Sequence, residues 1–156
     1  MYEATEYEAT GISYETDFYA WTRQQAALLR AEELETLDLP NLAEEIESMG
    51  ISQRKEITSR LIVLIMHLLK WQYQPASHDR PQPRSWLNTI TIQRQEIELV
   101  LRGSPSLRRE LPEHIAYAYP RARTRAHQET RIALNTFPIA CPYTQEQILD
   151  DFFFPF

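Results

Sequence analysis

We expect the fold to be built around one apolar run, Leu61-Ile-Val-Leu-Ile-Met-His-Leu-Leu69. As a helix it would be apolar on almost every side, whereas a helix on the surface of a protein carries a polar face. We therefore expect neighbouring helices or a second subunit to enclose it. The run is only about half as long as the roughly 18 apolar residues that a membrane-spanning helix needs, so it predicts a core helix and no membrane span.

The apolar stripe of this stretch extends back toward the N-terminus. Its members recur every three or four positions, which is the spacing of one face of an α-helix. They are Leu42, Ile46, Met49, Gln53, Ile57, Leu61, Leu64 and Leu68. Because the stripe keeps its phase across Gly50, we predict one long helix over residues 41–73. The alternative is a break at residues 49–52, with Gly50 past the end of one helix and Ser52 capping the next.

The segments on both sides of this helix have helical patterns as well. We expect a first helix from Thr16 or Asp17 to about residue 33, and later helices over 85–101, 106–111 and 112–133. A short helix should follow the capping-box motif Thr144-Gln-Glu-Gln147. Only three glycines occur, which argues against an all-β fold with its many tight turns.

The sequence thus predicts an all-α fold. We expect an elongated helical bundle of about four main helices, with one long central helix and short extra helices toward the C-terminus. A chain of 156 residues has the length of one domain, which we place at residues 14–156. Residues 1–13 are polar and offer little apolar surface to bury, so we expect a mobile tail there.

Charge is distributed unevenly along the chain. Residues 1–50 hold 12 acidic and two basic side chains (net −10), residues 51–140 hold seven and 14 (net +7), and the last 16 residues hold three and none (net −3). The acidic and basic segments can attract each other, or a basic patch can remain free for an acidic partner or nucleic acid. The net charge of −6 argues against nonspecific nucleic-acid binding.

The cellular compartment is predicted from the cysteine content and the N-terminus. Cys141 is the only cysteine, so no intramolecular disulfide can form. The N-terminus is acidic and lacks the apolar segment of a secretory signal. We therefore expect a cytoplasmic protein.

The candidates for catalysis are His67, Glu44 and Glu47. The two glutamates lie three positions apart on one helix face, as carboxylates do in helical-bundle metal sites, and His67, His114 or His127 could join them. The alternatives are an acidic first turn that suits the helix dipole and a histidine at the edge of the core that bonds to the backbone. We find no metal, phosphate-loop or dinucleotide motif, so we expect no cofactor and no metal.

Aromatic and basic residues alternate around the proline-rich loop over residues 74–83. Trp71, Tyr73, Arg84 and Trp86 could contact a partner, or could hold the loop against the bundle through cation–π contacts. Further along the chain, Arg121 and Arg125 share a helix face and could bind phosphate or pair with the acidic N-terminal half. The aromatic tail Phe152–Phe156 should dock on its own bundle or on a second subunit.

Several motifs in combination carry a resemblance to a known family. They are Tyr14-Glu-Thr-Asp-Phe-Tyr-Ala-Trp21, Asn41-Leu-Ala-Glu-Glu-Ile-Glu47, His67-Leu-Leu-Lys-Trp-Gln-Tyr73, Arg84-Ser-Trp86, and Phe137-Pro with Cys141-Pro-Tyr-Thr144 and a closing Asp-Phe pair. Together they resemble bacterial domain of unknown function family 29 over about residues 14–155. The resemblance implies an all-helical bacterial protein and implies no activity.

The functional hypothesis that fits these observations is a non-enzymatic protein-interaction or regulatory module. It predicts a protein partner or a homodimer, and neither nucleic acid nor a membrane as the usual partner. One alternative is a metal-dependent helical-bundle hydrolase that uses Glu44 or Glu47 with His67. A second alternative is nucleic-acid binding through the Arg121–Arg125 segment.

Overall fold

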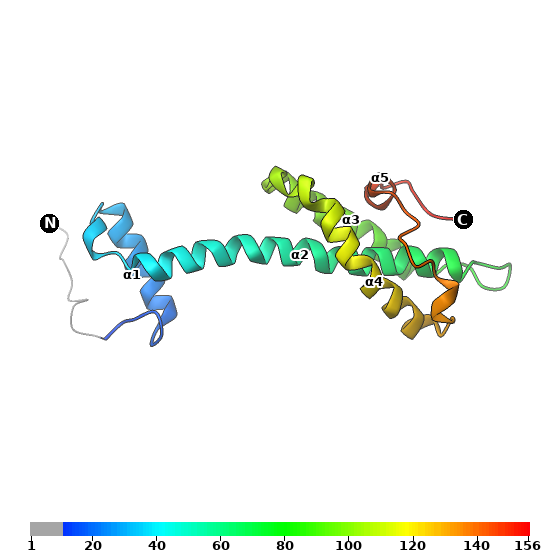
Figure 1. Cartoon of the computed structure of the whole chain (residues 1–156), viewed down its shortest axis with the longest axis horizontal. Coiled ribbons are helices and arrows are strands. Elements are labelled where there is room, and N and C mark those ends of the chain that lie inside the picture. The colour runs from blue at the N-terminus through cyan, green and yellow to red at the C-terminus, as the bar shows by residue number, and fades with distance from the viewer. Residues whose placement is uncertain (1–10) are drawn as a thin grey trace. The chain divides into compact units, whose positions relative to one another are not determined.

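The computed structural model describes residues 11–156, and these residues form helices and turns without a β-strand (Figure 1). The helices are α1 (Phe18–Arg30), α2 (Leu39–Tyr73), α3 (Arg84–Gly103), α4 (Leu111–Thr130) and α5 (Gln145–Leu149). Three 3-10 segments lie between them: η1 (Leu34–Thr36), η2 (Pro105–Glu110) and η3 (Leu134–Thr136). The predicted all-α class is confirmed. Residues 1–10 of the predicted tail lie outside the described residues.

Helix α2 is continuous from Leu39 to Tyr73, so the long central helix is confirmed and the alternative of a break at Gly50 is wrong. A methyl group added at Gly50 would meet no atom within 4 Å, so this glycine lies on an open helix surface and forms no turn. Contacts nevertheless group the chain into two units, residues 1–50 (unit 1) and residues 51–156 (unit 2). Each unit is described by itself below.

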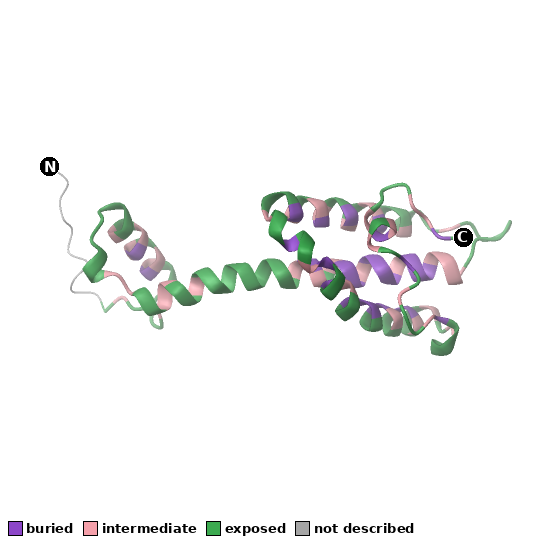
Figure 2. Ribbon diagram, turned by 45° about the horizontal axis from the view of Figure 1, so that its top comes forward, coloured by how far each residue is buried: buried purple, intermediate pink, exposed green. Residues whose placement is uncertain are grey.

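The core of unit 2 forms around the apolar stretch of α2. Nearly every residue from Leu61 to Leu69 is buried, as its all-round apolar pattern predicts (Figure 2). Helix α3 contributes Ile90, Ile97 and Leu101 to the same core, and α4 contributes Ala118, Ala122 and Ala126, all fully buried. The residues of α2 just before this core, 51–55, are exposed.

Polar contacts fix the direction of the helices in unit 2. Arg54 pairs with Glu110 at 2.8 Å and Lys70 pairs with Glu129 at 2.6 Å, so α2 and α4 run parallel. Ser104, just past the end of α3, donates to Gln53, which lies near the start of the part of α2 that belongs to unit 2. Helix α3 therefore runs antiparallel to α2. The two ion pairs align α2 with α4 near both ends of α4. This alignment determines which side chains of the two helices face each other.

The C-terminal segment is held by one buried arginine. Arg94 on α3 is only 2% exposed, and its guanidinium donates to the carbonyl oxygens of Ile148 (2.8 Å), Gln147 (3.2 Å) and Phe153 (2.9 Å). Burial lowers the pKa of Arg94, although arginine stays charged at any ordinary pH. Ahead of this segment, the predicted capping box is present, with Thr144 accepting from the Gln147 amide. Self-docking of the aromatic tail is seen for Phe154, which packs on Trp71, whereas Phe152 and Phe156 are exposed.

We expect Arg94→Met to lower the free energy of unfolding by about 3 kcal/mol, because three backbone carbonyls would lose a charged donor. Urea denaturation followed by circular dichroism measures this change. The control is Arg102→Met, since the Arg102 side chain is 76% exposed and its loss should change stability by less than about 0.5 kcal/mol. Equal effects of the two substitutions would contradict the anchoring role of Arg94.

Unit 1 is organised by a carboxylate and has few buried side chains. Asp38 accepts hydrogen bonds from the Trp21 indole (3.0 Å) and the Asn41 side chain (2.8 Å), while Gln25 accepts from the Asp38 amide (2.8 Å). Only Trp21 and Gln25 of α1 are buried. As predicted, α1 starts at a cap formed by Asp17, whose side chain accepts from the Ala20 amide. The polar network therefore replaces much of the apolar core that a larger unit would have.

The stability of unit 1 should depend on pH through Asp38. Hydrogen bonds from Asn41 and then Trp21 lower the pKa of this carboxyl, with desolvation opposing them. A lowered folded-state pKa contributes stability above the unfolded value of about 3.9, and this contribution is lost as pH falls through the folded-state pKa. We expect wild-type protein to lose more protection of the α1 amides between pH 5 and pH 2 than Asp38→Asn loses. Hydrogen exchange measures it, and identical losses would refute the role of Asp38.

Candidate partner-binding groove

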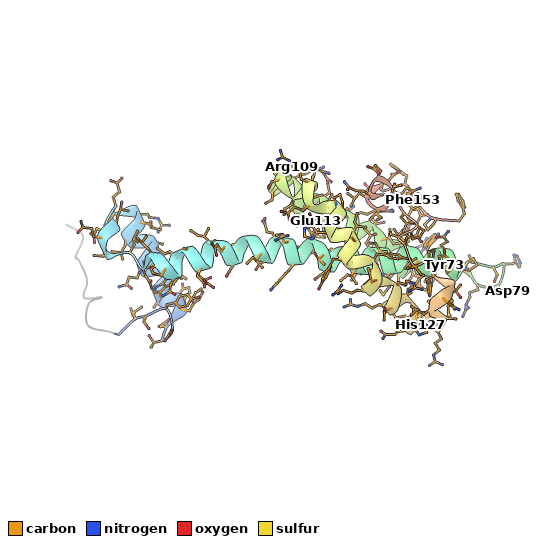
Figure 3. All side chains as sticks on the ribbon, in the orientation of Figure 1. Tyr73, Asp79, Arg109, Glu113, His127 and Phe153 are labelled. Atoms are coloured by element: carbon orange, nitrogen blue, oxygen red, sulfur yellow. The ribbon has the colours of Figure 1, made fainter. Side chains whose placement is uncertain are left out.

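A groove of about 640 Å³ lies between α2 and α4 of unit 2. Helix α2 lines it with Ile51, Arg54, Lys55, Thr58, Ser59 and Ile62. Helix α4 lines it with Glu113, which is labelled in Figure 3, and with His114, Tyr117, Arg121 and Arg125. Four basic side chains thus face one carboxylate in the lining.

The spacing of these residues explains why the groove forms. On α2 the lining residues recur at three- and four-residue steps, and they belong to a different helix face from the core residues Ile57, Leu61 and Leu64. On α4, Tyr117, Arg121 and Arg125 follow each other at four-residue steps beside the buried alanines. Two helices that pack through one stripe each leave their neighbouring stripes facing across an open edge, and that edge is the groove.

The floor of the groove is a hydrogen-bonded cluster between the two helices. The Thr58 hydroxyl donates to the Arg54 carbonyl oxygen (3.1 Å) and lies 2.9 Å from Nδ1 of His114. Because a hydroxyl has one hydrogen, this arrangement makes Nδ1–H of His114 the donor to Thr58. Nε2 of His114 then faces Glu110 at 3.4 Å, within ion-pair range, but it makes no hydrogen bond although the residue is only 7% exposed. A buried polar atom of the lining is therefore left without a hydrogen-bond partner.

Three cations at the rim of the groove have no ion-pair partner among residues 11–156. Lys55, Arg121 and Arg125 form none of the ion pairs of this part of the chain, whereas Arg54 pairs with Glu110. The Arg121 guanidinium lies 3.5 Å from the centre of the Tyr117 ring and donates to the Tyr117 carbonyl oxygen (2.9 Å). Stacking on an aromatic ring orients a guanidinium and leaves its other N–H groups free for an acceptor.

Arg123, in the same basic run, has a different role. It donates to the carbonyl oxygens of Phe137 (3.0 Å) and Leu134 (2.9 Å), so it holds the segment that follows α4. The sequence-based expectation that Arg121 and Arg125 share a face is met, since both line the groove. Their pairing with acidic residues of the first 50 stays a prediction.

The predicted catalytic candidates are distributed over both units. Glu44 and Glu47 are exposed residues of α2 in unit 1, and His67 belongs to unit 2. His67 is partly buried, its Nδ1 lies 2.8 Å from the Val63 carbonyl oxygen, and burial lowers its pKa. His127, labelled on α4 in Figure 3, uses Nδ1 toward the Ile132 carbonyl oxygen at 2.6 Å. Within residues 11–156, His, Cys, Asp and Glu form no group of three that could hold a metal ion. A catalytic role for these residues stays a prediction.

The predicted partner-binding residues Trp71, Tyr73, Arg84 and Trp86 lie at the end of α2 and the start of α3. Trp71 packs on Phe154, Tyr73 packs on Phe137, and the Lys70 ammonium lies 4.7 Å from the Trp86 ring centre. These contacts correspond to the alternative in which aromatic and basic residues hold the loop on the bundle. Trp86 also lines a smaller cavity of about 160 Å³ under this loop, beside exposed Arg84. Binding of a partner here stays a prediction.

Sequence reasoning did not single out Arg54, Lys55, Thr58 or Tyr117. For the three residues of α2, the signal is the polar stripe that positions 54, 55 and 58 form beside the apolar stripe. That stripe predicts a solvent-facing side, but its match to residues 110–125 depends on the packing register of α2 and α4. Arg94 was missed too, although its position continues the apolar stripe Ile90, Ile97 and Leu101 of α3.

The fold and the groove define this chain as an all-α protein with a basic interhelical surface. It belongs to the family described as Domain of unknown function DUF29, whose model matches residues 13–154, so the predicted family is confirmed. No curated protein and no solved structure matches the chain. Within the described part, no helix has both the length and the apolar character needed to cross a bilayer.

We expect Thr58→Val to destabilise the protein by about 1–2 kcal/mol, because Nδ1 of buried His114 would lose its hydrogen-bond partner. Chemical denaturation measures the change. Thr58→Ser keeps the hydroxyl and should lose less. As a control, Thr124→Val removes an exposed hydroxyl on α4 and should stay within about 0.5 kcal/mol of wild type. A neutral Thr58→Val would show that the cluster does not join the two helices.

Proposed function

We propose that this protein is a non-enzymatic interaction module whose groove between α2 and α4 binds acidic segments of proteins. The observation that carries the proposal is the set of rim cations, Lys55, Arg121 and Arg125, without an ion-pair partner in the described chain. Carboxylates are the natural partners of such cations, and arginine binds them with two parallel hydrogen bonds. We place this role in the cytoplasm of a bacterial cell.

The lining favours a protein segment over nucleic acid. Ile51 and Ile62 supply apolar surface within the groove, which aliphatic side chains of a protein can cover and a phosphate backbone cannot. An acidic segment with interspersed aliphatic residues satisfies both parts of the lining, because its carboxylates meet the rim and its apolar side chains meet the isoleucines. Complementary charges on the two sides of an interface determine specificity and association rate more than affinity. Salt screens such charges, so we expect binding that weakens as salt is added.

The experiment is fluorescence anisotropy with a labelled peptide of alternating glutamate and leucine. We define the groove variant as Lys55→Glu, Arg121→Glu and Arg125→Glu, and expect it to lower the affinity at least about tenfold, because like charges would face each other. The matched control variant carries Arg80→Glu, Arg102→Glu and Arg109→Glu, three exposed arginines outside the groove, and should bind as wild type does.

Three results would contradict the proposal. The peptide could fail to bind wild-type protein at low salt, or the control variant could lose as much affinity as the groove variant. Single-stranded DNA of matched charge could bind more tightly than the peptide, which would favour the nucleic-acid alternative. Circular dichroism of both variants checks that the fold is retained, as expected for substitutions of exposed side chains.

A further inference from the structure

Unit 1 presents an acidic, leucine-bearing corner where α1 ends. Helix α1 stops at Arg30, and Glu32 takes a left-handed conformation (φ 58°) that reverses the chain. Amides of Glu32 and Glu33 bond to the carbonyl oxygens of Leu29 and Leu28, so the reversal is hydrogen-bonded. We call residues 29–35 the acidic corner.

The acidic corner combines charge and apolar surface. Leu34 is 61% exposed and Leu29 is 48% exposed. Glu32, Glu33 and Glu35 are exposed as well, and none of the three forms an ion pair within the described chain. Three free carboxylates thus flank two exposed leucines within seven residues.

The groove of unit 2 has the complementary composition. Its rim holds three free cations, Lys55, Arg121 and Arg125, and its lining holds the apolar side chains of Ile51 and Ile62. The acidic corner offers three free carboxylates and two leucines. At the level of the whole sequence the same match appears as a net charge of −10 for residues 1–50 against +7 for residues 51–140. Opposite potentials of this kind steer two surfaces together and set their register.

We infer that the acidic corner of a second copy of this chain docks in the groove, so that the protein associates with itself through unlike surfaces. This inference rests on the proposed function, because it names the acidic segment that the groove binds. Each copy carries one corner and one groove, so the corner of one copy can occupy the groove of another and pair both sets of charges. The glutamates meet the rim cations, and Leu29 and Leu34 cover the isoleucines.

The test uses two charge-reversed chains and their mixture. The corner variant carries Glu32→Lys, Glu33→Lys and Glu35→Lys, so its corner and its groove are both positive. The groove variant defined above has a corner and a groove that are both negative. Each variant alone should lose at least about a hundredfold in the self-association constant. Their equimolar mixture should associate again, because each positive surface then finds a negative one.

Analytical ultracentrifugation over about a hundredfold range of protein concentration measures the association, since the equilibrium shifts with concentration. Wild-type protein should be associated at low salt and dissociate as salt is added. The control variant with Arg80→Glu, Arg102→Glu and Arg109→Glu should associate as wild type does. Recovery in the mixture also shows that both reversed chains are folded, so loss in the separate chains cannot be ascribed to misfolding.

Two results would overturn the inference: wild-type protein that is monomeric at every concentration, or a mixture that associates no better than its components. The peptide experiment separates these failures from failure of the proposed function. If the glutamate–leucine peptide binds the groove while the chain stays monomeric, the groove binds acidic segments but not this corner. If self-association occurs as inferred, the corner variant, whose groove is free, should bind the peptide more tightly than wild-type protein does at high concentration.

Discussion

The packing of the α2 stripe against the small face of α4 is the constraint on which unit 2 depends. Leu61, Leu64 and Leu68 share one buried core with the alanines of α4, whose small side chains leave room for the leucines. This contact brings the two parallel helices together. Thr58 then faces His114, and Arg54 faces Glu110. The groove is the open edge of this packing, so it forms only when α2 and α4 are packed together.

Much of the fold could be predicted because its signals are local or periodic. The phase of the stripe from Leu42 to Leu68 predicted a continuous α2, and a capping residue predicted the starts of α1 and α5. The groove could not be predicted, because it depends on which turn of α2 lies beside which turn of α4. No pattern within either segment contains that offset. Arg121 and Arg123 illustrate the limit: they are neighbours in one basic run, yet one lines the groove and the other binds Phe137.

Buried polar residues give this small core its specificity. Arg94, Lys70 and His114 are each less than a tenth exposed, and each has a partner at a defined position: backbone carbonyls for Arg94, Glu129 for Lys70 and Thr58 for His114. An apolar stripe alone tolerates a slip of one helical turn, since leucine replaces leucine. When a helix slips by one turn, a buried polar side chain on it loses its partner and the free energy of the fold rises. These residues therefore favour one register over its neighbours.

Unit 1 shows the opposite balance of forces. Large apolar side chains of this unit stay exposed, namely Phe18, Tyr19, Leu29, Leu34, Leu39, Ile46 and Met49. A unit of this size cannot bury enough surface to form a core of its own, so polar bonds around Asp38 hold it instead. The isolated chain therefore carries two unfavourable features, apolar surface in unit 1 and unneutralised cations in unit 2. An association that pairs the cations with the carboxylates of unit 1 and covers its leucines reduces both costs at once. This is the physical reason to expect that the charge segregation of the sequence serves binding between chains.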